Sequence, residues 1–179
     1  MRTTFKYAVA TCLLAPVAVC TFGQGPAGSP SPPASIANGG GEASPIFGVT
    51  IPAGYRQWEL VAPSQETGRL DELRAILGNS TAMKAYRLGT LPFPDGSVLA
   101  KLAWKHVPSS EIDGAFVPGA ATTVQFMVKD SKKYASTGGW GFGRFIGGKA
   151  VDEAQHRTCF ACHQANVKGH DFVFTRYAP

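Results

Sequence analysis

The chain has 179 residues, of which 44% are hydrophobic and 16% are charged. This size allows one ordinary domain with its own core and little more. The formal net charge is +5 at pH 7, and it falls by two to +3 if an N-terminal leader containing Arg2 and Lys6, but no acid, is removed. So mild a charge does not indicate a nucleic-acid-binding protein.

Residues 1–23 have the pattern of a secretory signal peptide, with two basic residues followed by an apolar stretch over residues 7–19. This stretch is too short for a typical membrane-spanning helix. Cys20 is a candidate for lipid attachment, but Val19 is larger than the residue that usually precedes such a cysteine. We therefore expect a soluble, exported, periplasmic protein without a lipid anchor.

Residues 24–45 are rich in Pro, Gly, Ala and Ser and contain almost no bulky apolar side chain. A segment of this composition cannot bury enough apolar surface to fold, so it predicts a disordered linker. The folded domain is expected to occupy residues 46–179.

Within the domain, short segments with alternating apolar residues and intervening turns favour a β-rich fold over a helix bundle. Two helices are predicted as well. The first covers residues 79–89, with Asn79 or Ser80 as N-cap and Gly89 just past its end, and the second covers roughly Asp152 to Val167. The predicted strands cover residues 55–62, 70–78, 97–107, 122–130 and 139–148.

The second helix carries the sequence Cys159-Phe-Ala-Cys162-His163, a C-x-x-C-H motif. This motif is typical of haem c, which two thioether bonds attach to the chain while the adjacent histidine binds the iron. A zinc site would need about four ligands and would have to recruit two more histidines, and a redox disulfide would be expected in a thioredoxin-like setting that is absent here. We therefore interpret the motif as the attachment site of one haem c, with His163 as the iron ligand.

The position of the motif argues against two common classes of cytochrome. Only 16 residues follow His163 and none is methionine, whereas ordinary electron-transfer cytochromes c take a methionine ligand from downstream of the motif. The four-helix cytochromes c′ need four long amphipathic helices, and the segments here are short.

The domain instead resembles the cytochrome P-460 family, which includes the β-type cytochromes c′. The matching stretches span about residues 50–179 and include "YRQWELV", "LRAILGN", "PDGSVLAKLAWK", "VKDSKKY", "GGWGFGRF" and "CFACHQAN". The resemblance implies an α+β fold, mainly an antiparallel β-sheet with a few short helices, and haem c packed against the sheet with an open distal site.

The resemblance also implies roles for two basic residues. In hydroxylamine-oxidising relatives a lysine after the "DG" turn bonds to an edge carbon of the porphyrin, and Lys101 occupies the matching position. Its apolar neighbours favour this reading over a lysine that reaches from a strand edge to solvent. Arg74 matches an arginine near the haem, where it would steer an anion or hold a propionate; a surface salt bridge to Glu72 or Asp71 is the alternative.

Three further positions bear on catalysis. Oxidising relatives carry a carboxylate where this chain has Gln125, which can hydrogen-bond a ligand but cannot act as a general base. Asp130 could replace it only if its turn aimed it inward, and an aspartate that caps the turn is the alternative. Ala154 aligns with a small residue on the distal side, although an ordinary loop alanine would look the same. No iron-binding role is expected for the remaining histidines and methionines of the domain, His106, His156, His170, Met83 and Met127.

Two functions follow from the resemblance. The first is oxidation of hydroxylamine to nitrogen oxides, with electrons passed to a small soluble cytochrome, and Lys101 favours it. The second is capture of nitric oxide or another diatomic gas without turnover, which Gln125 favours. The family also implies a homodimer.

Overall fold

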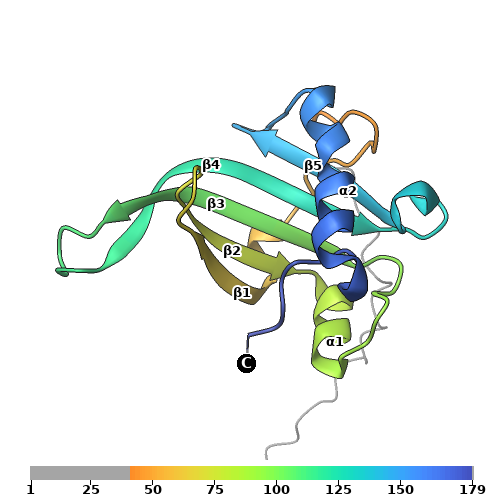
Figure 1. Ribbon diagram of the computed structural model, residues 1–179, viewed down its shortest axis with the longest axis horizontal. Helices are drawn as coiled ribbons and strands as arrows, with labels where there is room; N and C mark the ends of the chain where they lie inside the picture. Colours follow the sequence, from red (N-terminus) through yellow and green to blue (C-terminus); the bar gives the residue numbers. More distant parts are fainter. Residues whose placement is uncertain (1–40, 179) are drawn as a thin grey trace, which may run out of the picture. The chain divides into compact units, whose positions relative to one another are not determined.

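The computed structural model describes residues 41–178, which form a six-stranded antiparallel sheet and two α-helices (Figure 1). The strands follow one another in the sheet in chain order: β1 (Glu59–Glu66), β2 (Glu72–Gly78), β3 (Val98–Pro108), β4 (Phe116–Lys129), β5 (Trp140–Ile146) and β6 (Lys149–Ala150). Helix α1 (Ser80–Leu88) joins β2 to β3, and α2 (Glu153–Val167) follows β6. The predicted α+β fold with a mainly antiparallel sheet is therefore confirmed.

The predicted signal peptide and residues 24–40 of the predicted linker lie outside the described residues. Near the end of that linker Ser44 is buried, and its hydroxyl donates a 2.9 Å hydrogen bond to the carbonyl of Phe142. None of the helices between residues 41 and 178 is both long and apolar enough to cross a membrane.

Both predicted helices are present, and local side chains explain where they begin and end. Asn79 caps α1 by accepting a 3.0 Å hydrogen bond from the amide of Ala82, and Gly89 ends it in the left-handed conformation with φ of 63°. Asp152 caps α2 in the same way, through a 2.9 Å bond from the amide of Gln155. These short-range signals lie entirely within the neighbouring sequence.

The first predicted strand, 55–62, begins too early. Tyr55–Gln57 form a 3-10 helix, and β1 starts only at Glu59. Gly54 turns the chain with φ of 70°, after which the ring of Tyr55 packs edge-on against Phe126 at 5.1 Å between centroids. A contact with a residue so distant in sequence overrides the alternating pattern.

Two other strand predictions need correction. The stretch 139–148 is not one strand, because Gly147 and Gly148, with φ of 58° and 82°, make a two-residue turn between β5 and β6. The predicted strand 122–130 is too short, because β4 already begins at Phe116, where it pairs with the far end of β3 in an extended hairpin.

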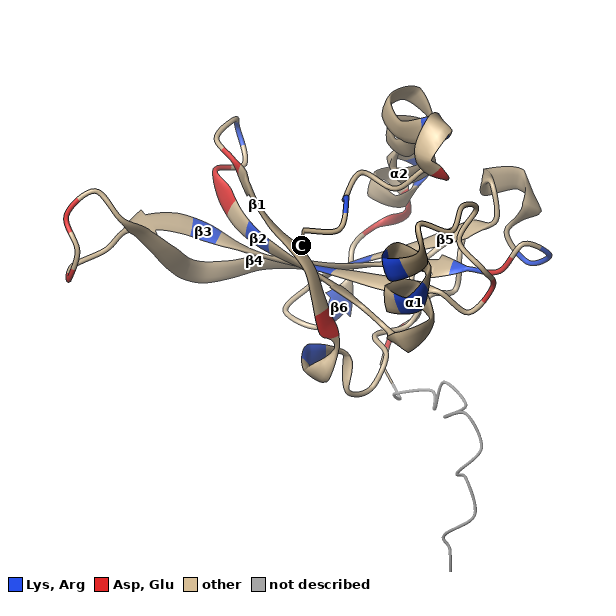
Figure 2. Cartoon of the chain, turned by 90° about the horizontal axis from the view of Figure 1, so that it is seen from below, with Lys and Arg blue, Asp and Glu red and all other residues tan. Residues whose placement is uncertain are grey.

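The sheet separates buried apolar side chains from the residues that form the site. Ala100 and Phe126 are paired neighbours on β3 and β4, and both are almost fully buried in the core. The next residues along these strands, Lys101 and Gln125, point to the opposite face because successive side chains of a strand alternate. Helix α2 lies over that face (Figure 2).

Candidate haem site

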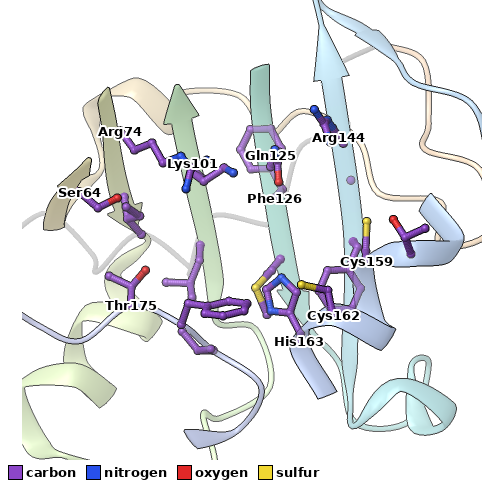
Figure 3. Close-up of a pocket in the computed structure, with 18 of the residues that line it drawn as sticks. Ser64, Arg74, Lys101, Gln125, Phe126, Arg144, Cys159, Cys162, His163 and Thr175 are labelled. Atoms are coloured by element: carbon purple, nitrogen blue, oxygen red, sulfur yellow. The ribbon is translucent and has the colours of Figure 1, made fainter. Parts of the chain in front are cut away.

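A cavity of about 400 Å³ lies between the sheet, α2 and the C-terminal segment 173–175 (Figure 3). Four residues that pair across neighbouring strands cross its floor in one row: Ile76, Lys101, Gln125 and Arg144. Directly paired residues of a sheet share a face, so the row presents its polar groups to the same space.

Helix α2 brings the C-x-x-C-H motif to the wall of this cavity. Cys159, Cys162 and His163 all line it, because residues three and four apart share one face of a helix. Both thiols are free and are not bonded to each other, which leaves them available for thioether bonds. Burial raises the pKa of the Cys159 thiol, which therefore stays protonated at neutral pH.

The imidazole of His163 is oriented by a backbone carbonyl. Its Nδ1 lies 2.7 Å from the carbonyl oxygen of Phe172. A carbonyl can only accept a hydrogen bond, so Nδ1 carries the proton and Nε2 keeps the lone pair that a metal ligand requires. Burial lowers the pKa of His163, which further favours the neutral ring. The rings of Phe142 and Phe174 hold it from two sides, at centroid distances of 5.0 and 4.9 Å.

The carbonyl that orients His163 belongs to a turn anchored by a buried ion pair. Asp171 and Phe172 both have positive φ, at 47° and 62°, a conformation that costs free energy for residues with a side chain. The carboxylate of Asp171 accepts hydrogen bonds of 2.8 and 2.9 Å from the ammonium group of Lys129. The amide of Phe93 donates to the same carboxylate, and the indole of Trp140 donates to the carbonyl of Asp171. Sequence analysis did not identify this network.

Lys101 projects from the middle of β3 into the cavity. Burial, reinforced by the charge of Arg74, lowers its pKa to about 8. A lysine with this pKa presents a much larger fraction of neutral, nucleophilic amine at neutral pH than an exposed one.

The position of Arg74 is compatible with both of the roles considered for it. Its side chain lines the cavity, and it also forms ion pairs with Glu66 and Glu72. The pair with Asp71 is not formed; Asp71 lies 3.3 Å from His106 instead. Burial alone would raise the pKa of Glu72, but hydrogen bonds from Thr122 and Arg74 outweigh it, so this carboxyl stays ionised.

Of the three positions considered for catalysis, one lines the cavity and two do not. Gln125 lines the cavity, and its amide group donates a 3.2 Å hydrogen bond to Thr123. Asp130 lies outside the cavity lining, because its carboxylate caps a turn by accepting hydrogen bonds from the amides of Lys132 and Lys133 at 3.1 and 2.9 Å. Ala154 lies in the first turn of α2, not in a loop, and is not part of the cavity wall.

Arg144 is a charged cavity residue that the sequence patterns did not single out. It lies on β5 opposite Gln125. The sequence feature that could have identified it is its place in "GGWGFGRF", where it is the one charged residue in a stretch rich in glycine and aromatic residues. Its Nε atom is buried and has no hydrogen-bond partner among residues 41–178.

The other histidines are occupied by structural contacts. His156 is fully buried, with Nδ1 2.9 Å from the carbonyl of Asp152 and Nε2 accepting from the amide of Arg144. It lies within α2, three residues before Cys159. His170 bonds to the carbonyl of Val173.

The two methionines of the domain differ in position. Met83 is buried in the core, whereas Met127 is partly buried against the core and lines the cavity.

The donor set fits a covalently attached haem better than zinc. The cavity brings together two thiols one helical turn apart and an imidazole whose Nε2 is free, above a partly apolar floor. In the described part of the chain, no cluster of three or more His, Cys, Asp or Glu side chains could hold a metal ion. The zinc alternative therefore lacks its ligands.

Comparison with known proteins agrees with this reading. The family described as Cytochrome P460 matches the chain over residues 52–175, which contains every cavity residue discussed above. No match is found among the curated proteins.

Proposed function

The chain belongs to the cytochrome P460 family, and from this premise we propose that it is an exported mono-haem protein that oxidises hydroxylamine to nitrogen oxides. The cofactor of the family is haem c, whose iron supplies the redox chemistry when bound. In this chain Cys159 and Cys162 would form the two thioether bonds, and His163 would ligate the iron through Nε2. The proposal includes a homodimer and a small soluble cytochrome as electron acceptor.

Lys101 is the observation that carries this proposal. Its amine lies in the same cavity as the haem-binding motif, and its pKa of about 8 makes the neutral form accessible. We propose that its nitrogen bonds to an edge carbon of the porphyrin. The new N–C bond replaces one N–H and one C–H bond, so both hydrogens leave as protons and two electrons pass to an oxidant, for which a peroxide is suitable.

The other polar residues of the floor would orient the substrate. The amide of Gln125 can donate to or accept from hydroxylamine, but it cannot remove a proton near neutral pH. The proton acceptor would then be water that enters the cavity, because Asp130 is held in its turn.

A second candidate function is supported by a specific observation. The residues that line the cavity include no aspartate or glutamate in the described part of the chain. A site without a carboxylate can bind nitric oxide or another diatomic gas, which requires no general base, without turning it over.

Peptide mass spectrometry of the haem-loaded protein distinguishes the two functions. The hydroxylamine oxidase proposal expects the Lys101 peptide joined to the haem peptide, a red-shifted Soret band, and reduction of an added soluble cytochrome by hydroxylamine. Lys101→Arg, which cannot form the bond, should return the Soret band to that of ordinary haem c. A free Lys101 peptide, together with tight nitric oxide binding and no reduction of the acceptor, would favour the gas-binding function.

A further inference from the structure

The cavity carries an arginine whose charge is not matched by an acid. Three cationic residues line the cavity, Arg74, Lys101 and Arg144. Arg74 is neutralised by Glu66 and Glu72. No carboxylate within residues 41–178 forms a salt bridge with Arg144, and its buried Nε donates to no acceptor there. A buried donor without a partner costs free energy, and the half-buried side chain that carries it lines the cavity, so an anion in the cavity would offset its uncompensated charge.

The backbone of Arg144 is held in place from two directions. Its amide donates a 3.1 Å hydrogen bond to Nε2 of the fully buried His156, and its carbonyl accepts a 3.0 Å bond from the amide of Val151. His156 is itself fixed by its contact with Asp152 at the start of α2. The backbone of Arg144 is therefore fixed before a ligand binds, which lowers the conformational entropy that the protein loses on binding.

The two arginines stand at opposite ends of the floor (Figure 3). Arg74 projects from β2 and Arg144 from β5, three strand spacings across and two residues along the sheet, so their backbones are roughly 16 Å apart. Arg144 lies on the side of Cys159, whose thiol pKa it lowers against the larger effect of burial. Arg74, at the other end of the floor, would be the residue that holds a porphyrin carboxylate when haem is bound.

We propose that Arg144 is the anion-recognition residue of this cavity and that it binds a small planar oxyanion of the size and charge of nitrite. A guanidinium presents a rigid fork of donors that matches two oxygens of such an anion. Gln125, its direct neighbour on β4, places a further donor beside it. This inference rests on haem loading in the proposed function but not on turnover of hydroxylamine.

Ligand titration of the ferric, haem-loaded protein tests the proposal without any catalytic assay. The probes are nitrite as the anion and imidazole as the neutral ligand, each followed by the Soret absorbance. Arg144→Gln should weaken nitrite binding about 10-fold or more, as loss of a charge-assisted hydrogen bond predicts, and change imidazole binding less than about twofold. Arg144→Lys, which keeps the charge but lacks the planar fork, should fall between.

The matched control is Arg157→Gln, which removes the same charge from the exposed surface of α2. It should leave both affinities within about twofold of the wild type. If Arg144→Gln fails to load haem, Arg144→Lys and the weakening of nitrite binding by added salt in the wild type decide the question.

Three results would overturn the assignment. Equal loss of nitrite and imidazole affinity would mean that Arg144 only shapes the cavity. A larger nitrite effect in Arg74→Gln would place the anion site at the other end of the floor. Unchanged nitrite affinity in Arg144→Gln would mean that Arg144 does not recognise the anion. Each result is independent of whether hydroxylamine is oxidised, because neither hydroxylamine nor an electron acceptor is present.

Discussion

Replacing Asp171 by Asn is expected to destabilise the protein strongly, although it changes only one side-chain atom. Lys129 and Asp171 have side chains that are 6% and 8% exposed, and the ammonium nitrogen lies 2.8 Å from the nearer carboxylate oxygen. An asparagine can still accept the hydrogen bond from the amide of Phe93. It cannot neutralise Lys129, which would keep at most one of its two hydrogen bonds to this side chain, together with the carbonyl of Gly138 and the face of Trp140.

Leaving one charge of a buried pair uncompensated costs about 3–5 kcal/mol. A domain of this size shifts its Tm by roughly 3–5 °C per kcal/mol, so the variant should melt roughly 10–25 °C lower. The assay is thermal unfolding of the haem-loaded protein followed by far-ultraviolet circular dichroism. Glu153→Gln, which breaks the exposed pair with Arg157, is the control and should shift Tm by no more than about 2 °C.

Asp171→Asn should also change the environment of His163, the expected iron ligand. Asp171 and Phe172 hold the strained turn whose carbonyl bonds to Nδ1 of His163. A weaker hydrogen bond makes the imidazole a poorer electron donor, so the reduction potential should rise and the iron–histidine stretching frequency should fall. Glu153→Gln should move neither quantity.

A double variant separates the charge effect from a loss of shape. Lys129→Met combined with Asp171→Asn removes both charges and should recover much of the lost stability, because no uncompensated ion remains. A single Asp171→Asn variant that melted within about 2 °C of the wild type, with an unchanged potential, would refute the reasoning.

Further predictions concern the attachment and coordination of the haem. The first concerns haem-loaded protein that still has a free Lys101 and is treated with peroxide. The rate of cross-linking should rise about 10-fold per pH unit up to pH 8 and then level off, because only the neutral amine reacts. A cross-linking rate, measured by mass spectrometry, that did not depend on pH would contradict this. In a Lys101→Arg background, which removes the proposed third bond, Cys159→Ala combined with Cys162→Ala should release haem into acid-acetone. Each single cysteine variant in that background should retain the haem through one thioether, and haem-stained gels distinguish the cases. Electron paramagnetic resonance of the ferric protein should give a high-spin signal that is unchanged in Met127→Ala, because Met127 lines the cavity without binding the iron. A low-spin signal that disappeared in this variant would instead identify Met127 as a sixth ligand of the iron.

The sequence by itself determined the features that depend on near neighbours. The C-x-x-C-H spacing places three donors on one face of a helix, and Asn79 and Gly89 mark the ends of α1 through contacts within a few residues. Alternating apolar residues predicted the middle strands for the same reason. Lys101 was identified from a family pattern, and the structure places it in the cavity.

Only the tertiary structure decided which distant residues meet. Strand register, set by pairing along the whole sheet, brings Arg144 beside Gln125, where no carboxylate of residues 41–178 forms a salt bridge with it. A turn at the C-terminus supplies the carbonyl that fixes the tautomer of His163, and no local pattern marks it because a backbone carbonyl has no residue type. Asp130 shows the converse: its residue type permitted a general base, but hydrogen bonds within its own turn direct the carboxylate away from the cavity. Residue type and spacing thus specify which chemistry is available, while burial and register decide which groups remain free to perform it.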